Sequence, residues 1–160
     1  MNHSTQEPFD EFTAVIRELT DTANKIAQTE EAKAQAASQK RHDLIDGLIQ
    51  DEQAYILKLR GLEQRRLRLS EALGWKSLTF RQILDKAAPS QNKQLKPLFS
   101  ELESQLDYLQ QSRKSAEKII QVRLHELEVS IAQRQGGSYD NTGSINLNSP
   151  VRPKMRDQYV

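Results

Sequence analysis

The stretch PFDEFTAVIRELTDTANKI, residues 8–26, carries apolar side chains at intervals of three and four residues. This spacing places them along one side of an α-helix. The stripe continues through the Ala-rich segment EEAKAQAAS, which forms helix readily but buries little surface, so that neighbours approach it closely or it stays partly exposed. Pro8 suits a first helical turn, where its missing N–H leaves no hydrogen bond unmade. The stripe consists of Phe9, Phe12, Ile16, Leu19, Ala23, Ile26, Glu30, Ala34 and Ala37.

A second periodic run extends from Ile45 to Leu73, and Gly74 follows at the usual position of a glycine that ends a helix. A single rod of about 65 residues would leave its apolar stripe unburied, so we expect a turn near residues 38–42. The run contains Ile45, Leu48, Glu52, Tyr55, Leu59, Leu62, Arg66, Leu69 and Leu73.

A short helix is predicted at residues 78–88, with Ser77 as a possible N-cap and Pro89 as its end. The last helix is predicted at about residues 91–134, capped by Ser90 and ended by two glycines. Pro97 predicts a kink in this helix or a new start. Its stripe contains Leu95, Leu98, Phe99, Leu102, Leu106, Leu109, Arg113, Ala116, Ile120, Leu124, Leu127 and Ile131.

Three long helices joined by short connections predict an all-α fold, an elongated antiparallel bundle with coiled-coil-like packing and one additional short helix. Residues 1–135 would form this helical domain. Residues 136–160 are rich in Gly, Asn, Ser and Pro and are predicted to be a flexible C-terminal tail.

The composition of the chain limits the classes of function that we expect. The 23 basic and 22 acidic residues nearly balance, so no strong field attracts nucleic acid or anionic lipid. The sequence has no cysteine, no apolar run long enough to span a bilayer and no secretory signal at its N-terminus, so we expect a cytoplasmic protein without membrane insertion. The three histidines lie on separate segments and form no metal motif. We expect neither a cofactor nor enzymatic activity.

The run RGLEQRRLRL contains four arginines, Arg60, Arg65, Arg66 and Arg68. They spread around the helix and glutamates lie among them, which favours a solvated, salt-bridged face over a phosphate-binding stripe. Three charged residues also interrupt apolar stripes, namely Glu52, Arg66 and Arg113. Either their stems pack while their charged ends reach water, or an ion pair fixes the register of the helices.

The segment EKIIQVRLHELEVSIAQ, residues 117–133, has two apolar stripes. Ile120, Leu124, Leu127 and Ile131 continue the stripe of the last helix. Ile119, Val122 and Val129 lie on nearly the opposite side. This second stripe could pack within the fold, against another helix or the folded-back tail. Alternatively it could dock another protein.

The sequence resembles the FlgN family of flagellar export chaperones over roughly residues 10–145. The resemblance depends on the pattern of Leu59, Leu62, Glu63, Arg66, Leu73 and Gly74, and on Tyr139, Asp140 and Gly143 after the last helix. It implies a cytosolic chaperone that binds C-terminal helical segments of hook-associated junction proteins and delivers them to the flagellar export gate. The cargo site would lie in the double-striped segment, with Ile119, Val122 and Val129 in contact with cargo. Ile120, Leu124, Leu127 and Ile131 would be core residues or a second rim, and Tyr139 would contact the export gate.

The main alternative is a structural coiled-coil homo-oligomer or adaptor with no chaperone role, in which the second stripe is a self-association seam. A homodimer is also compatible with a chaperone. The other alternative, nucleic-acid binding by the arginines of residues 60–68, predicts a steep salt dependence.

Overall fold

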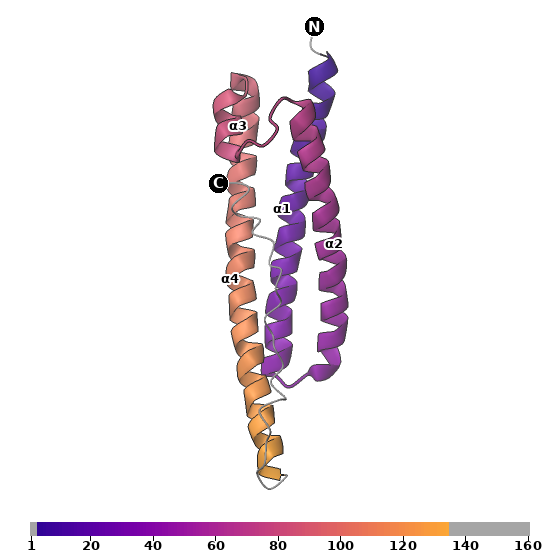
Figure 1. Ribbon diagram of the computed structural model, residues 1–160, viewed down its shortest axis with the longest axis vertical. Coiled ribbons are helices and arrows are strands. Elements are labelled where there is room, and N and C mark those ends of the chain that lie inside the picture. The colour runs from indigo at the N-terminus through magenta and orange to yellow at the C-terminus, as the bar shows by residue number, and fades with distance from the viewer. Residues whose placement is uncertain (1–2, 135–160) are drawn as a thin grey trace.

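The computed structural model describes residues 3–134, apart from a few side chains near each end of that range. Four helices follow one another: α1 (His3–Ser38), α2 (His42–Ala72), the short α3 (Phe80–Lys86) and α4 (Pro89–Arg134). Figure 1 shows α1 and α4 running in the same direction, with α2 antiparallel to both. The described chain contains no strand. The predicted all-α fold is confirmed as an elongated bundle of three long helices and one short helix.

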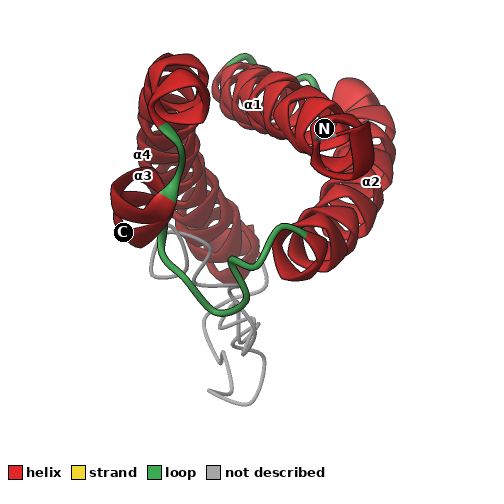
Figure 2. Ribbon diagram, turned by 90° about the horizontal axis from the view of Figure 1, so that it is seen from above, coloured by secondary structure: helices red, strands yellow, loops and turns green. Residues whose placement is uncertain are grey.

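Helix α1 is the central element of the bundle. It packs against both α2 and α4, whereas α2 and α4 have little direct contact with each other. Figure 2 shows the three long helices arranged as an open arc with α1 in the middle. This position requires burial on two sides, and small side chains outside the predicted stripe are indeed buried in α1: Thr13, Val15, Thr22, Ala27, Thr29 and Ala36. In the Ala-rich half, Ala34, Ala36 and Ala37 are also buried, so its neighbours approach this side of the helix closely.

Aromatic side chains of the core meet where the segment after α2 joins the bundle. Phe12 from α1 makes edge contacts with Trp75 and with Phe99 of α4, at ring-centroid distances of 5.4 and 6.1 Å. Phe80 from α3 stacks on Phe99 at 4.0 Å. Aromatic pairs contribute about 0.5–1.5 kcal/mol beyond the burial of their area. These rings therefore hold all four segments together at this end of the bundle.

Trp75 reaches the core because α2 ends in a tight turn at Gly74. Gly74 has φ +80°, a conformation that glycine adopts without a steric cost. The N–H of Trp75 donates to the carbonyl of Ser70 at 2.7 Å, and the N–H of Gly74 donates to Glu71 at 3.1 Å. This pair of bonds is the Schellman motif. The predicted role of Gly74 is therefore confirmed, and the turn directs Trp75 inward.

The same motif ends α1, but without a glycine. Lys40 adopts φ 57°, while the N–H of Arg41 donates to the carbonyl of Ala36 at 2.8 Å and that of Lys40 to Ala37 at 3.2 Å. The turn predicted near residues 38–42 is confirmed. Its sequence signal is weak, because a lysine occupies the left-handed position where a glycine is usual.

Three predictions about helix ends were wrong. Helix α1 begins at His3, so that Pro8 lies inside it. Thr79, not Ser77, caps α3: its side chain accepts from the N–H of Gln82, and the Gln82 side chain accepts from the N–H of Thr79. This reciprocal pair is a capping box. Pro89 begins α4, so the helix starts before residue 91 and Ser90 lies inside it rather than at its cap. Of the two alternatives for Pro97, a new start is wrong, because Pro97 lies within α4, and a kink stays a prediction.

Arg66 is buried, and its charged end does not reach water. Its side chain is 4% exposed and bonds to both carboxylate oxygens of Glu63, at 2.7 and 2.9 Å. Its guanidinium also lies 5.6 Å from the ring centroid of Phe80, a cation–π geometry. The contact with Phe80 therefore links α2 to α3, while the ion pair with Glu63 lies within α2.

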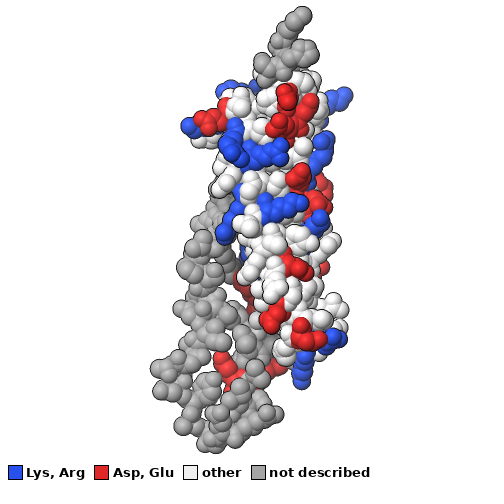
Figure 3. All heavy atoms as spheres, turned by 90° about the vertical axis from the view of Figure 1, so that its right-hand side faces the viewer, with Lys and Arg blue, Asp and Glu red and all other residues white. Residues whose placement is uncertain are grey.

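The remaining arginines of the basic run lie on a mixed surface. Arg65 pairs with Glu11 of α1 at 3.5 Å, and Arg60 and Arg68 are exposed. Figure 3 shows acidic side chains interspersed among the basic ones on the face that it presents. This is the salt-bridged surface favoured by the sequence, and it does not form a continuous basic stripe.

Candidate protein-docking site

The C-terminal part of α4, residues 117–134, extends past the rest of the bundle and is called the arm below. Glu31 of α1 hydrogen-bonds to Tyr108 and to Ser112 of α4. Because α1 and α4 run in the same direction, the end of α1 at Ser38 lies level with about residue 119 of α4. The remaining 15 or so residues of the helix extend about 22 Å further, and Figure 1 shows this end projecting beyond the α1–α2 turn.

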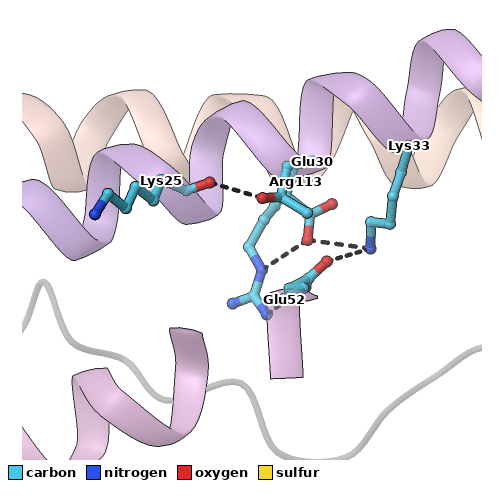
Figure 4. A network of polar contacts seen from close by, with 6 residues as sticks. Lys25, Glu30, Lys33, Glu52 and Arg113 are labelled. Carbon is cyan, nitrogen blue, oxygen red and sulfur yellow. Dashed lines mark hydrogen bonds and ion pairs between the residues drawn. The ribbon is translucent and has the colours of Figure 1, made fainter. Parts of the chain in front are cut away.

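A cluster of charged side chains lies just before the arm and joins all three long helices (Figure 4). Lys33 of α1 contacts Glu30 at 3.3 Å and Glu52 of α2 at 2.5 Å. Arg113 of α4 lies 3.7 Å from Glu30 and 3.9 Å from Glu52. The two carboxylates are almost buried, with side chains 5% and 10% exposed. Glu52 and Arg113 therefore take part in an ion pair between helices, and its role in fixing the register of the helices stays a prediction.

The crowding of two carboxylates changes their pKa values. Burial, together with the hydrogen bond and the negative charge of Glu52, raises the pKa of Glu30 to about 7. Burial also acts upward on the pKa of Glu52, but the hydrogen bond with Glu30 and the ammonium of Lys33 outweigh it and hold that pKa below its usual value. Near pH 7 the Glu30 carboxyl is therefore protonated in about half of the molecules, and at pH 6 or below in most of them.

We predict that Glu30 makes the bundle less stable as the pH rises from about 4.5 to 7. Its pKa is higher in the folded than in the unfolded chain, so the folded state binds more protons in this range and loses free energy of unfolding as the proton leaves. The expected loss is about 1–3 kcal/mol. Urea unfolding at several pH values measures it, and Glu30→Gln should flatten the curve in this window.

The matched control for this prediction is Glu18→Gln, because Glu18 is an exposed glutamate on the same helix. This variant should keep the slope of the unmodified protein. Glu52 contributes outside the window, since its lowered pKa gives stability that is lost only as the pH falls below about 4.5. An unchanged slope in Glu30→Gln would contradict the assignment of the proton to Glu30.

The arm leaves apolar side chains exposed. Among the side chains of α4 that the structure describes, Ala116 is the last buried one, at 0% exposure, and none in the arm is buried. Val122 is 52% exposed and Val129 is 42% exposed, while Ile119 and Ile120 are half-buried. The second stripe of the sequence is thus partly accessible on a projecting helix, a feature typical of interaction surfaces.

The structure describes the other residues of the predicted site only in part or not at all. Leu124, Leu127 and Ile131 belong to α4, but the description of the structure does not include their side chains, and Tyr139 lies outside the described residues. One residue was overlooked by the sequence analysis. Glu126 is exposed and, at about 100° per residue, shares a side of the helix with the second stripe. Below, Ile119, Val122, Glu126 and Val129 are called the outer strip.

Among residues 3–134 no group of three or more His, Asp or Glu side chains could hold a metal ion. No helix in that part of the chain is both long and apolar enough to cross a membrane.

Comparison with known families identifies the chain. The model of the FlgN protein family matches residues 1–144, which is most of the sequence and includes the arm. The chain belongs to the FlgN family. FlgN proteins have a general role as flagellar export chaperones and are not known as enzymes. Comparisons with curated proteins and with solved structures gave no significant match.

Proposed function

We propose that this FlgN-family chain binds C-terminal helical segments of hook-associated junction proteins along the outer strip and delivers them to the flagellar export gate. The observation that supports the proposal is the exposure of Val122 and Val129, at 52% and 42%, on a helix that extends past the bundle. A cargo helix can approach this surface without displacing α1 or α2. Recognition would follow the helix-on-helix mode, in which apolar side chains at three- and four-residue spacing meet a partner.

The strip suits a complex that must later release its cargo. Complete burial of an aliphatic side chain contributes about 1.5–3 kcal/mol, and the outer strip offers three, of which two are about half exposed. Association itself costs several kcal/mol. The binding free energy that remains after this cost is small enough for the cargo to dissociate, as delivery requires. If the arm separates further from the bundle, the inner stripe formed by Ile120, Leu124, Leu127 and Ile131 would provide a second rim for the same cargo.

The proposal assigns separate roles to the two parts of the chain. Residues 1–135 are the proposed chaperone domain, and residues 136–160 follow it in the sequence. Tyr139, just after the arm, is the proposed contact with the export gate. A tyrosine suits such a contact because it combines a large apolar ring with a hydroxyl group.

The outer strip can be tested by single substitutions in the full chain. Val122→Ser and Val129→Ser should each weaken binding to C-terminal helical peptides of hook-associated proteins by about 5- to 30-fold, because each removes about 1–2 kcal/mol of apolar contact. Isothermal titration calorimetry measures the affinity. Leu57→Ser is the matched control, since Leu57 is 71% exposed on α2 and lies outside the strip, and it should bind like the unmodified chain.

Two outcomes would contradict the proposal. If all three variants bind the peptides with the affinity of the unmodified chain, the cargo site lies elsewhere on the molecule. A dimer whose association is lost in Val122→Ser, together with no binding of cargo peptides, would instead support the alternative of a structural homo-oligomer. Light scattering on the same samples distinguishes these cases.

A further inference from the structure

One side of α4 loses its cover at the level where α1 ends. Leu109 and Ala116 lie on the side of α4 that packs against α1, and they are 7% and 0% exposed. Ile120 lies one turn further along the same side and is only half-buried. The change coincides with the end of α1, which is level with about residue 119 of α4. At this point the chain reverses and returns as α2, so no described helix continues α1 along the arm (Figure 1).

The sequence of the arm stays apolar on this uncovered side. The inner stripe continues the three- and four-residue spacing of the buried stripe of α4. The side of α4 that meets α1 within the bundle therefore has the same apolar pattern beyond the end of α1. A further helix in line with α1 would extend the α1–α4 interface along the arm by about 22 Å, which is the length of about 15 residues or four helical turns.

The α1–α2 turn closes one end of this surface. Residues 39–41 follow directly after α1, so a helix in line with α1 would meet them with its own end. Lys40 and Arg41 are exposed there, and Arg41 pairs with Asp43 at 3.2 Å. The ammonium of Lys40 would attract a carboxylate in the terminal turn of such a helix. Below, the inner stripe together with residues 39–41 is called the shelf.

Resting on the docking role proposed for the arm, we propose that the shelf binds a partner helix in line with α1, without separation of the arm from the bundle. The partner is an amphipathic helix of about four turns with one aliphatic stripe and an acidic residue in the turn that meets Lys40. A shorter helix leaves part of the inner stripe uncovered. A longer helix gains no further contact, because the α1–α2 turn and the end of α4 limit the shelf.

The absence of cysteine from the sequence allows a test of position by cross-linking. Gln39→Cys places one thiol in the turn, where Gln39 is exposed. A designed helical peptide of about 15 residues has an Ile and Leu stripe and an acidic residue at one end. With oxidised glutathione as the oxidant, a cysteine at the acidic end should form the disulfide roughly tenfold faster than one at the other end. Leu57→Cys is the matched control, since Leu57 is exposed on α2, and it should show no preference.

Substitutions test the apolar side and the charge separately. Ile120→Ser should weaken binding of the peptide by about 5- to 20-fold, and Lys40→Glu by about three- to fivefold. Lys58→Glu makes the same change in net charge at an exposed lysine of α2, and it should bind like the unmodified chain. Fluorescence anisotropy measures the affinities, and circular dichroism verifies that each variant stays helical.

The length of the peptide provides a further readout. Among peptides of about 11, 15 and 22 residues with the same stripe, the affinity should rise up to about 15 residues and then stay constant. A steady rise up to the longest peptide would overturn the inference, because the shelf offers no surface for the additional turns.

The outcomes separate this inference from the proposed function. If Val122→Ser weakens binding of cargo segments, while Ile120→Ser and Lys40→Glu leave peptide binding unchanged and neither peptide end cross-links preferentially, the inference is overturned and the outer strip stands. If no peptide and no cargo segment binds the unmodified chain, both are overturned. A dimer that is lost in Ile120→Ser would assign the shelf to a second copy. Peptide binding only after removal of residues 136–160 would assign the shelf to that segment of the chain, and either result overturns the inference.

Discussion

Replacement of Phe12 by alanine is expected to lower the free energy of unfolding by about 3–5 kcal/mol. The Phe12 side chain is 0% exposed and contacts the rings of Trp75 and Phe99 at centroid distances of 5.4 and 6.1 Å. Its loss leaves a cavity at the point where α1, the segment after α2 and α4 meet. The rings around that cavity belong to different segments and cannot all collapse into it. Urea unfolding followed by circular dichroism measures the change.

Leu57→Ala provides the control for this substitution, since Leu57 is 71% exposed on α2. It should change the free energy of unfolding by no more than about 0.5 kcal/mol. The difference between the two variants tests whether the aromatic cluster holds the bundle together. A loss in Phe12→Ala similar to that in Leu57→Ala would show that it does not.

Replacement of Arg66 by methionine is the second substitution expected to have a large effect, with a loss of about 3–5 kcal/mol. The side chains of Arg66 and Glu63 are 4% and 14% exposed. Methionine fills part of the space but leaves the Glu63 carboxylate in a poorly hydrated position without the guanidinium. The cation–π contact with Phe80 is also lost. Thermal and urea unfolding both measure the effect.

The double variant Glu63→Gln/Arg66→Met separates the two causes. Removal of both charges should restore at least half of the stability lost in Arg66→Met, because the cost of the single variant comes mainly from the remaining carboxylate. If the double variant is no more stable than the single one, packing of the arginine stem and its aromatic contact determine the loss instead. The pair would then have little electrostatic importance.

Most helices could be predicted from apolar periodicity, because burial on one side repeats every three or four residues whatever the neighbour is. Their ends were harder to predict. Gly74 signalled the end of α2 correctly, since a left-handed residue is usually glycine. Lys40 and Ser77 adopt φ 57° and 62° without being glycine. The packing of the chain around Lys40 and Ser77 outweighs the local preference for glycine, and the sequence at these positions gives no sign of this packing.

The candidate site was likewise predictable only in part. Periodicity identified Ile119, Val122 and Val129 as a stripe, but could not distinguish a buried seam from an exposed one. Periodicity also did not predict the central position of α1. Small residues such as Thr22 and Ala27 widen the buried surface of this helix, but they add little hydrophobicity to the sequence pattern. Glu126 was overlooked because a search for apolar spacing omits the charged member of a strip.

The sequence by itself determined the all-α class, the three long helices with their turns and the presence of two apolar stripes near the end of the last one. These are properties of local spacing and composition, and each helix carries them whatever it packs against. Only the tertiary structure decided which helix is central, that Glu30, Glu52 and Arg113 meet, and that α4 extends past the end of α1. These features depend on the relative register of helices far apart in the sequence, which is established by packing between them rather than by any one segment.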